Sequence, residues 1–179
     1  MGELRAGGLF VGPLIAESGI STLVEALDLF PGVCIDVIGI GPERPRVEAH
    51  PRVRYLGVTA HAAVQARMRR TAYLVMPSLS YEATPRPLVE AFAHGLPVIA
   101  SRLGALAELV EPGRNGLLFE PGSARDLARR LAWAEAFPEK MRQMGLCARA
   151  DYEARFVAEW GWQKLYGERR RSARAAQTH

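Results

Sequence analysis

Residues 76–104, MPSLSYEATPRPLVEAFAHGLPVIASRLG, carry the pattern that decides the fold of this 179-residue chain. The apolar run at 72–76 leads into it and is typical of a parallel strand buried on both faces. Pro85 and Pro87 exclude a regular element directly after this strand, because each proline lacks a backbone donor. The strand must therefore end in an irregular loop.

A helix is predicted to follow the loop at 88–94, with Pro87 at its first turn, where a missing N–H costs nothing. A second buried strand is predicted at 97–100. This order of strand, loop and helix leaves N–H groups and the positive end of a helix dipole at the carboxyl edge of a sheet, the edge at which the strands end. Sheets of α/β proteins bind phosphate-bearing ligands at that edge.

The rest of the chain continues the alternation of strands and helices. Strands are predicted at 9–11, 33–38, 53–56, 72–76, 97–100 and 117–119. Helices are predicted at 21–29, 44–49, 60–70, 88–94, 106–110, 124–134, 139–150 and 157–166, with Ser123 as the cap of the sixth. The fold class is therefore α/β, a Rossmann-like doubly wound parallel sheet.

Composition indicates one globular domain. The chain is 49% hydrophobic and has a net charge of +4, with 21 arginines among its 23 basic residues. We expect a single domain over 1–167 and a basic, frayed tail over 168–179. Because that tail holds Arg169, Arg170, Arg171 and Arg174, the body is closer to neutral, and we expect no nucleic-acid partner.

The two cysteines, Cys34 and Cys147, do not form a disulfide framework, and reduced thiols are expected. The polar N-terminus does not resemble a signal peptide, and no apolar run has the length of a membrane span. We expect a cytoplasmic protein, with a peripheral position at a membrane left open. No His, Cys or carboxylate set has the spacing of metal ligands, so we expect neither a metal nor a tightly bound cofactor.

The chain from Gly12 to Tyr166 resembles the C-terminal half of family-4 glycosyltransferases of the GT-B fold. That family shows Pro-Ser, a glutamate, seven residues, Glu-Ala and then Gly-x-Pro-Val, and residues 76–104 hold each landmark. Gly-x-Gly-Pro at 39–42 and Asn-Gly-Leu-Leu at 115–118 extend the likeness. The resemblance implies a donor-binding domain of a retaining hexosyltransferase that uses a UDP- or GDP-sugar. An N-terminal domain that binds the acceptor would be missing from this chain.

The resemblance assigns a role to each of the two glutamates. The Glu82 carboxylate would face the donor sugar near the reacting carbon and act in catalysis. Glu90, expected in the first helical turn, would accept hydrogen bonds from the two ribose hydroxyls, which suit a bidentate acceptor. The open alternatives are a solvated loop carboxylate for Glu82 and a favourable helix-dipole interaction for Glu90.

Five further positions are expected to bind the donor. Arg86, Pro87 and Leu88 form the start of the helix, where the N–H groups of Leu88 and its neighbour would meet the distal phosphate. Gly41 and Val58 follow the second and third strands and would border the base; ordinary strand-exit turns are the alternative.

The first loop departs from the family, which places an arginine after the first glycine and a lysine before the next. Here Gly12 is followed by Pro13, and Ser18 stands before Gly19. Gly12 and Ser18 are kept as donor-binding positions, but both diphosphate-binding cations are absent. Fixed cations stabilise a departing diphosphate, and the loss of one such contact costs on the order of 3 kcal/mol.

Two hypotheses follow from these residues. The first is the donor-binding half of a glycosyltransferase, with a nucleotide sugar and the N-terminal acceptor domain as partners. The second is a catalytically silent binding or scaffolding module that retains the fold. A nicotinamide-dependent enzyme is disfavoured, because the turn at 11–19 lacks Gly-x-Gly-x-x-Gly.

Overall fold

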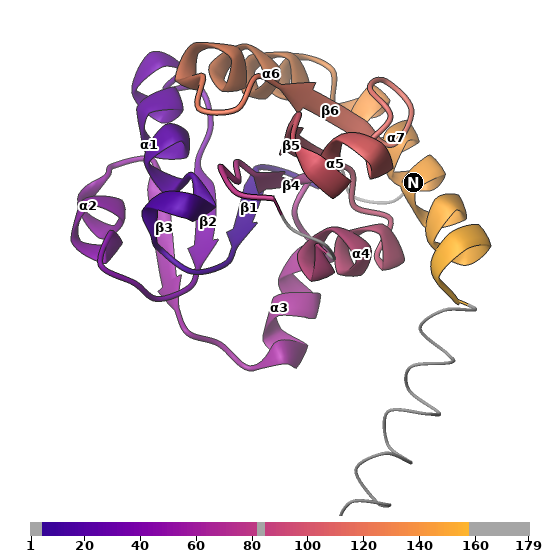
Figure 1. Ribbon diagram of the computed structural model, residues 1–179, viewed down its shortest axis with the longest axis horizontal. Coiled ribbons are helices and arrows are strands. Elements are labelled where there is room, and N and C mark those ends of the chain that lie inside the picture. The colour runs from indigo at the N-terminus through magenta and orange to yellow at the C-terminus, as the bar shows by residue number, and fades with distance from the viewer. Residues whose placement is uncertain (1–4, 82–84, 158–179) are drawn as a thin grey trace, which may run out of the picture.

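The computed structural model describes residues 5–81 and 85–157 of the chain. Six parallel strands form one sheet in the order β3-β2-β1-β4-β5-β6 (Figure 1). They are β1 (Gly8–Val11), β2 (Ile35–Ile38), β3 (Val53–Gly57), β4 (Tyr73–Met76), β5 (Val98–Ser101) and β6 (Gly116–Phe119). The predicted fold class, a Rossmann-like doubly wound parallel sheet, is confirmed.

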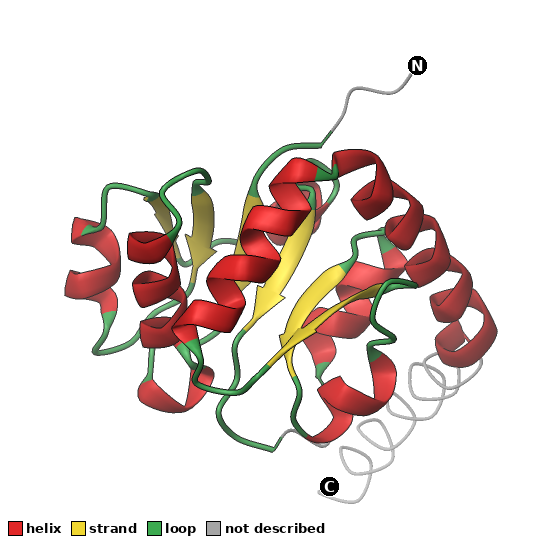
Figure 2. Cartoon of the chain, turned by 90° about the horizontal axis from the view of Figure 1, so that it is seen from above, coloured by secondary structure: helices red, strands yellow, loops and turns green. Residues whose placement is uncertain are grey.

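Helices cover both faces of this sheet (Figure 2). One face carries α1 (Ile20–Leu29), α2 (Arg44–Ala49) and α6 (Ala124–Ala136). The other carries α3 (His61–Met68), α4 (Arg86–Ala93) and α5 (Gly104–Leu109). The long helix α7 (Pro138–Asp151) contributes buried residues to the cores on both faces.

Consecutive residues of each central strand pack into the hydrophobic cores on opposite faces of the sheet. In β1, Leu9 packs under α3 and α4, whereas Phe10 packs under α1. In β4, Leu74 and Val75 divide in the same way, and both are essentially unexposed. Because side chains of a strand alternate between faces, a sheet covered on both sides requires continuous apolar runs.

Local signals explain several element boundaries. The Ser123 hydroxyl accepts a hydrogen bond from the Asp126 N–H at 3.2 Å, which confirms the predicted cap of α6. The strand predicted at 33–38 begins only at Ile35, and Cys34 is exposed just before it. Both cysteines are free thiols, as expected.

The break predicted between 150 and 157 is wrong. Residues Tyr152–Phe156 continue α7 as a π-helix, labelled η2. No glycine or proline interrupts this stretch, and Phe156 packs with the α4 side of the core. Of the helix predicted at 157–166, only Val157 lies within the described residues. No helix in the described part of the chain is long and apolar enough to cross a membrane.

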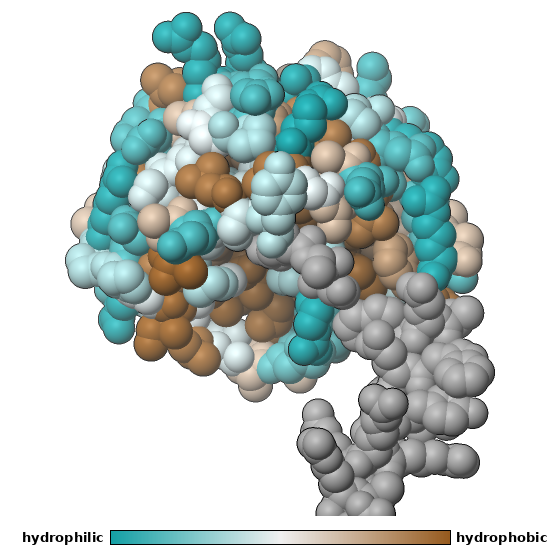
Figure 3. Space-filling model, viewed as in Figure 1, coloured by the Kyte–Doolittle hydropathy of each residue, from teal (hydrophilic) through white to brown (hydrophobic). Residues whose placement is uncertain are grey.

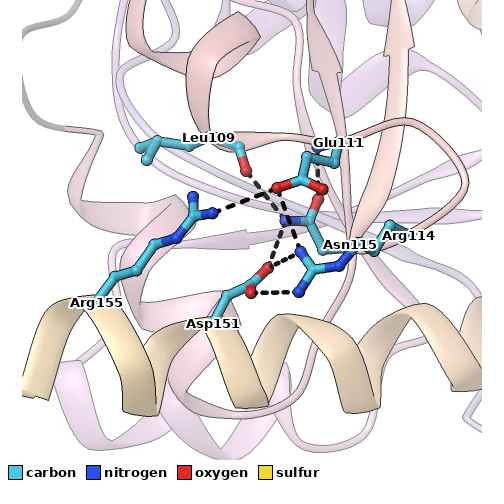
Figure 4. Close-up of polar contacts among 6 residues, drawn as sticks. All are labelled: Leu109, Glu111, Arg114, Asn115, Asp151 and Arg155. Atoms are coloured by element: carbon cyan, nitrogen blue, oxygen red, sulfur yellow. Dashed lines mark hydrogen bonds and ion pairs between the residues drawn. The ribbon is translucent and has the colours of Figure 1, made fainter.

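A polar cluster joins the end of α7 to the turn before β6 (Figure 4). The fully buried Asn115 accepts a hydrogen bond from the Glu111 N–H and donates to the Leu109 carbonyl and the Asp151 carboxylate, at 2.8, 3.0 and 2.8 Å. Arg114 donates twice to Asp151, each time at 2.7 Å. These guanidinium hydrogen bonds hold the pKa of Asp151 below its usual value despite its burial.

Candidate functional site

The loops after β1 and β4 lie beside the point at which the strand order of this sheet reverses direction. From β1 the chain proceeds to β2 and β3 on one side, whereas β4 leads to β5 and β6 on the other. The loops after β1 and β4 therefore both lie at the carboxyl edge beside this switch point. Open α/β sheets bind their ligands at this switch point.

The two loops contact each other through their backbones. The Leu79 N–H donates to the Glu17 carbonyl at 2.8 Å. Gly19 has a φ of +71°, and a Cβ atom there would lie 1.8 Å from the Pro77 carbonyl oxygen. Only glycine satisfies both the left-handed conformation and this close approach. The first loop is thus fixed against the exit of β4 by backbone contacts.

Helix α4 begins at Arg86, two residues before the predicted start, because a proline in the first turn, here Pro87, needs no N–H. The N–H groups of Leu88 and Val89, expected to meet a phosphate, both donate to the Pro85 carbonyl, at 3.0 and 3.2 Å. Both N–H groups are thus engaged at the helix start in this structure, and their contact with a phosphate stays a prediction. Leu88 contributes a fully buried side chain to the core.

Glu90 lies in the second turn of α4, not in the first, so the helix dipole does not account for it. Its side chain is 19% exposed, and a carboxylate oxygen lies 3.9 Å from an Arg86 nitrogen one turn earlier. Arg86 itself is 71% exposed. This arrangement presents a partly shielded carboxylate on the helix that follows the β4 loop.

Glu82 lies outside the described residues, together with Ala83 and Thr84. Its catalytic role stays a prediction.

The glycines after β1 and β2 have a structural role. The Gly12 N–H donates to the Ile38 carbonyl at 3.0 Å. A Cβ atom at Gly41 would lie 2.3 Å from the Leu14 carbonyl oxygen, which accepts from the Glu43 N–H. Backbone packing between the loops explains why position 41 is glycine, as in an ordinary strand-exit turn, and base binding by Gly41 stays a prediction.

Apolar side chains at the carboxyl edge are unusually exposed. Val58, predicted to border a base, is 72% exposed after β3, and Ile40 after β2 is 64% exposed. Tyr81, which the sequence analysis missed, is 81% exposed after β4, and its ring would clash with a Cβ atom at Gly104. Figure 3 shows hydrophobic atoms between hydrophilic ones on the face seen in Figure 1. The sequence signal that could have identified these exposed side chains is their position within loops rich in glycine and proline.

The first loop offers little side-chain chemistry to an anion. The Ser18 hydroxyl donates to the Ile15 carbonyl at 2.7 Å, so its proton is already used within the turn. Pro13 is exposed and has no donor. The lost cations of this loop are therefore not replaced by Ser18.

Two other polar residues lie at this edge, one at the end of β5 and one directly after it. Arg102 is exposed, and its guanidinium forms no hydrogen bond or ion pair with the described residues. The hydroxyl of Ser101 is fully buried, and across the part of the chain that the structure describes it has no hydrogen-bond partner. Within the same residues, no cluster of three His, Cys, Asp or Glu side chains has the geometry to hold a metal ion.

Comparison with known proteins decides the family. The model of the family described as glycosyl transferases group 1 matches residues 6–135. The chain belongs to this family. An uncharacterised glycosyltransferase of Methanocaldococcus jannaschii is 29% identical over 163 residues, which cover 88% of this chain and 44% of that protein.

Solved structures agree with this assignment. Sucrose-phosphate synthase of Thermosynechococcus elongatus superposes with a TM-score of 0.81 at 31% identity, over 96% of this chain and 46% of that one. Anabaena HepE, solved in complex with UDP-glucose, superposes with a TM-score of 0.77 at 25% identity, over 92% and 48%. The chain thus has the fold of a C-terminal GT-B domain and spans about half the length of the proteins it matches.

Proposed function

We propose that this chain is the donor-binding half of a retaining glycosyltransferase of the hexosyltransferase type, and that it binds a UDP-sugar at the carboxyl edge between the β1 and β4 loops. A GDP-sugar is the alternative donor. An N-terminal domain would supply the acceptor site. The UDP-glucose complex of the related HepE supports a uridine donor.

The observation that carries the proposal is the placement of Glu90. A carboxylate that is 19% exposed lies on the helix after β4, beside the switch point, and an Arg86 nitrogen lies 3.9 Å from it. Vicinal ribose hydroxyls are two neutral donors that a carboxylate accepts with both oxygens. A partly shielded carboxylate also forms stronger hydrogen bonds than one in bulk water.

The phosphates would rely on the exposed arginines of this edge. Arg86 lies at the start of α4 and Arg102 follows β5, so both lie at the carboxyl edge of the sheet. In this proposal they take over the charge stabilisation that Pro13 and Ser18 do not provide. Glu82 would act on the donor sugar.

A second candidate is a nucleotide-binding module without transferase activity. The Ser18 hydroxyl is held by the Ile15 carbonyl, and both cations of the first loop are missing. In that case nucleotide binding persists while sugar transfer is absent.

Calorimetric titration of the chain with UDP, GDP and ADP tests the proposal. We expect saturable binding of UDP in preference to GDP and ADP, weakened about tenfold by Glu90→Ala, the loss expected for a charge-assisted hydrogen bond. Glu108→Ala, which removes an exposed carboxylate from α5, serves as the matched control. Equal binding in the wild type and Glu90→Ala would contradict the proposed site.

A further inference from the structure

A large cavity among the described residues lies at the amino edge of the sheet, where the strands begin. Its volume is about 1150 Å³, and Ala72 and Pro97, which precede β4 and β5, line its sheet side. His94 at the end of α4 and Arg142 on α7 line its walls. The cavity is therefore on the opposite side of the domain from the proposed donor site.

Arg5 brings a partly buried cation into this cavity. Its guanidinium donates to the carbonyls of His94 and Gly95, at 3.2 Å each, and contacts no carboxylate among the described residues. Burial lowers the pKa of this guanidinium from its usual value, yet arginine stays charged. A partly buried guanidinium that is held by carbonyls and by no carboxylate of the described residues retains a positive charge that suits a bound anion.

Three more arginines line the same cavity. The exposed Arg69 guanidinium forms no hydrogen bond or ion pair within the described part of the chain. Arg142 pairs with Glu139 at 2.7 Å, and Arg149 pairs with Glu153 at 2.8 Å, but these are exposed pairs of low cost to rearrange. Among the described residues, Glu139 is the only carboxylate that lines the cavity.

The pKa of His94, which lines this cavity, is lowered. Its pKa is lowered first by burial, then by the positive charges of Arg69, Arg5 and Arg149. Burial and these charges both disfavour the protonated imidazole.

A neighbouring cavity of about 680 Å³ shares Arg5 and Arg69 and extends the positive surface. Arg54 and Arg67 lie there against the single carboxylate of Asp36, at 2.7 and 3.2 Å. The adjacent Arg70 has no carboxylate partner among the described residues. Among the described residues that line this second cavity, arginines therefore outnumber carboxylates.

The floor of the larger cavity is apolar. Ala93 lines it from the end of α4, Pro97 from the position just before β5, and Met141 and Leu146 from α7, with Leu146 60% exposed. A ligand that fills this cavity therefore needs an apolar portion as well as a negative group.

We propose that this amino-edge cavity binds the phosphoryl group of an organic phosphate monoester, with Arg5 and Arg69 as its principal ligands and the apolar floor against the esterified group. A guanidinium donates two parallel hydrogen bonds to phosphate oxygens, which matches this chemistry better than a single ammonium does. The inference does not depend on the proposed donor site, which lies at the other edge.

Titration of the full 179-residue chain with phenyl phosphate tests the proposal, with UDP in excess to remove any contribution from the carboxyl edge. We expect saturable binding, tighter than that of inorganic phosphate because of the apolar floor. Arg69→Gln should weaken it about tenfold. Arg69 is exposed and bonded to no described residue, so this variant is expected to fold, which circular dichroism would verify.

The matched control is Arg129→Gln, which removes the same charge from an exposed position on α6 that lines neither cavity. It should leave phenyl phosphate binding unchanged. Absence of saturable binding, or equal losses in Arg69→Gln and Arg129→Gln, would overturn the proposal.

A second arm distinguishes a soluble ester from a lipid head group. The chain is sedimented with vesicles of phosphatidylcholine that contain or lack phosphatidic acid. Co-sedimentation that requires phosphatidic acid and is lost in Arg69→Gln identifies a lipid head group as the source. Binding of phenyl phosphate without co-sedimentation identifies a soluble ester, and both results uphold the phosphoryl site.

Discussion

The two edges of this sheet hold their surroundings together by different means. At the carboxyl edge the loops meet through backbone contacts, such as the approach of Gly19 to the Pro77 carbonyl and the Leu79 N–H bond to Glu17. At the amino edge, polar side chains form contacts, among them the Arg114–Asp151 pair and those of the arginines in the amino-edge cavity.

This difference follows from how a parallel sheet is built. Helices that follow strands begin at the carboxyl edge, so backbone N–H groups and helix dipoles already provide positive potential there. Helix C-termini and their carbonyls gather at the amino edge, where cations are favoured instead. Arg5 and Arg149 meet this demand, since both donate to carbonyls at the end of α4.

The largest effect is expected at the carboxyl edge, for Gly19→Ala. The substitution forces a Cβ atom into the Pro77 carbonyl and strains a φ of +71°. We expect a loss of at least about 3 kcal/mol in the free energy of unfolding, since strain alone costs about 1–3 kcal/mol. Urea denaturation monitored by circular dichroism measures it.

Gly113→Ala separates strain from packing. Gly113 also has a positive φ, +81°, but a Cβ atom there would meet nothing within 4 Å. This variant should lose only about 1 kcal/mol. Equal losses in both variants would show that the loop contact at Gly19 is not what holds the carboxyl edge.

At the amino edge, Asn115→Ala removes a fully buried side chain that bonds Glu111, Leu109 and Asp151. We expect a loss of about 2–3 kcal/mol, because buried polar groups are left without partners. The exposed Gln143→Ala on α7 should change stability by less than about 0.5 kcal/mol. A loss as small as that of Gln143→Ala would contradict a side-chain-held amino edge.

The Asp151 carboxylate makes this edge sensitive to acid. Its pKa is lower in the folded than in the unfolded chain, where it is about 3.9. Its stabilising contribution is therefore fully present above about pH 4 and is lost as the pH falls through the folded pKa.

Asp151→Asn tests this pH dependence. At neutral pH we expect the wild type to be more stable by about 1–2 kcal/mol, a figure discounted because the Arg114 side chain is 44% exposed. The difference in unfolding free energy should shrink as the pH is lowered below 4. A difference that stays constant down to pH 2 would show that the carboxylate charge is not involved.

The sequence predicts the sheet well because its signals are local. Continuous apolar runs and the prolines at 85 and 87 mark the strands and the start of α4, and Ser123 marks α6. The π-helical continuation at Tyr152–Phe156 was missed, since it depends on burial of Phe156 against distant α4. Helix boundaries decided by tertiary packing lack a local signal.

The candidate site was predictable only in part. Spacing singled out Glu90, but its second-turn position depends on where α4 begins. The phosphate contact expected of the Leu88 N–H stays a prediction, since this N–H donates to the Pro85 carbonyl in the structure. The amino-edge cavity was missed entirely, since Arg5, Arg69 and Arg149 are far apart in sequence and only the fold brings them together.

The most direct test of the donor site combines Glu90→Gln with a modified ligand. The affinities of wild type and variant are measured for UDP and for its 2′,3′-dideoxy analogue. Because Glu90 is proposed to accept hydrogen bonds from the ribose hydroxyls, Glu90→Gln should weaken the affinity for UDP about tenfold and leave the affinity for the analogue unchanged. An equal loss of affinity for both ligands would contradict ribose binding by Glu90 and, with it, the placement of the nucleotide at the carboxyl edge.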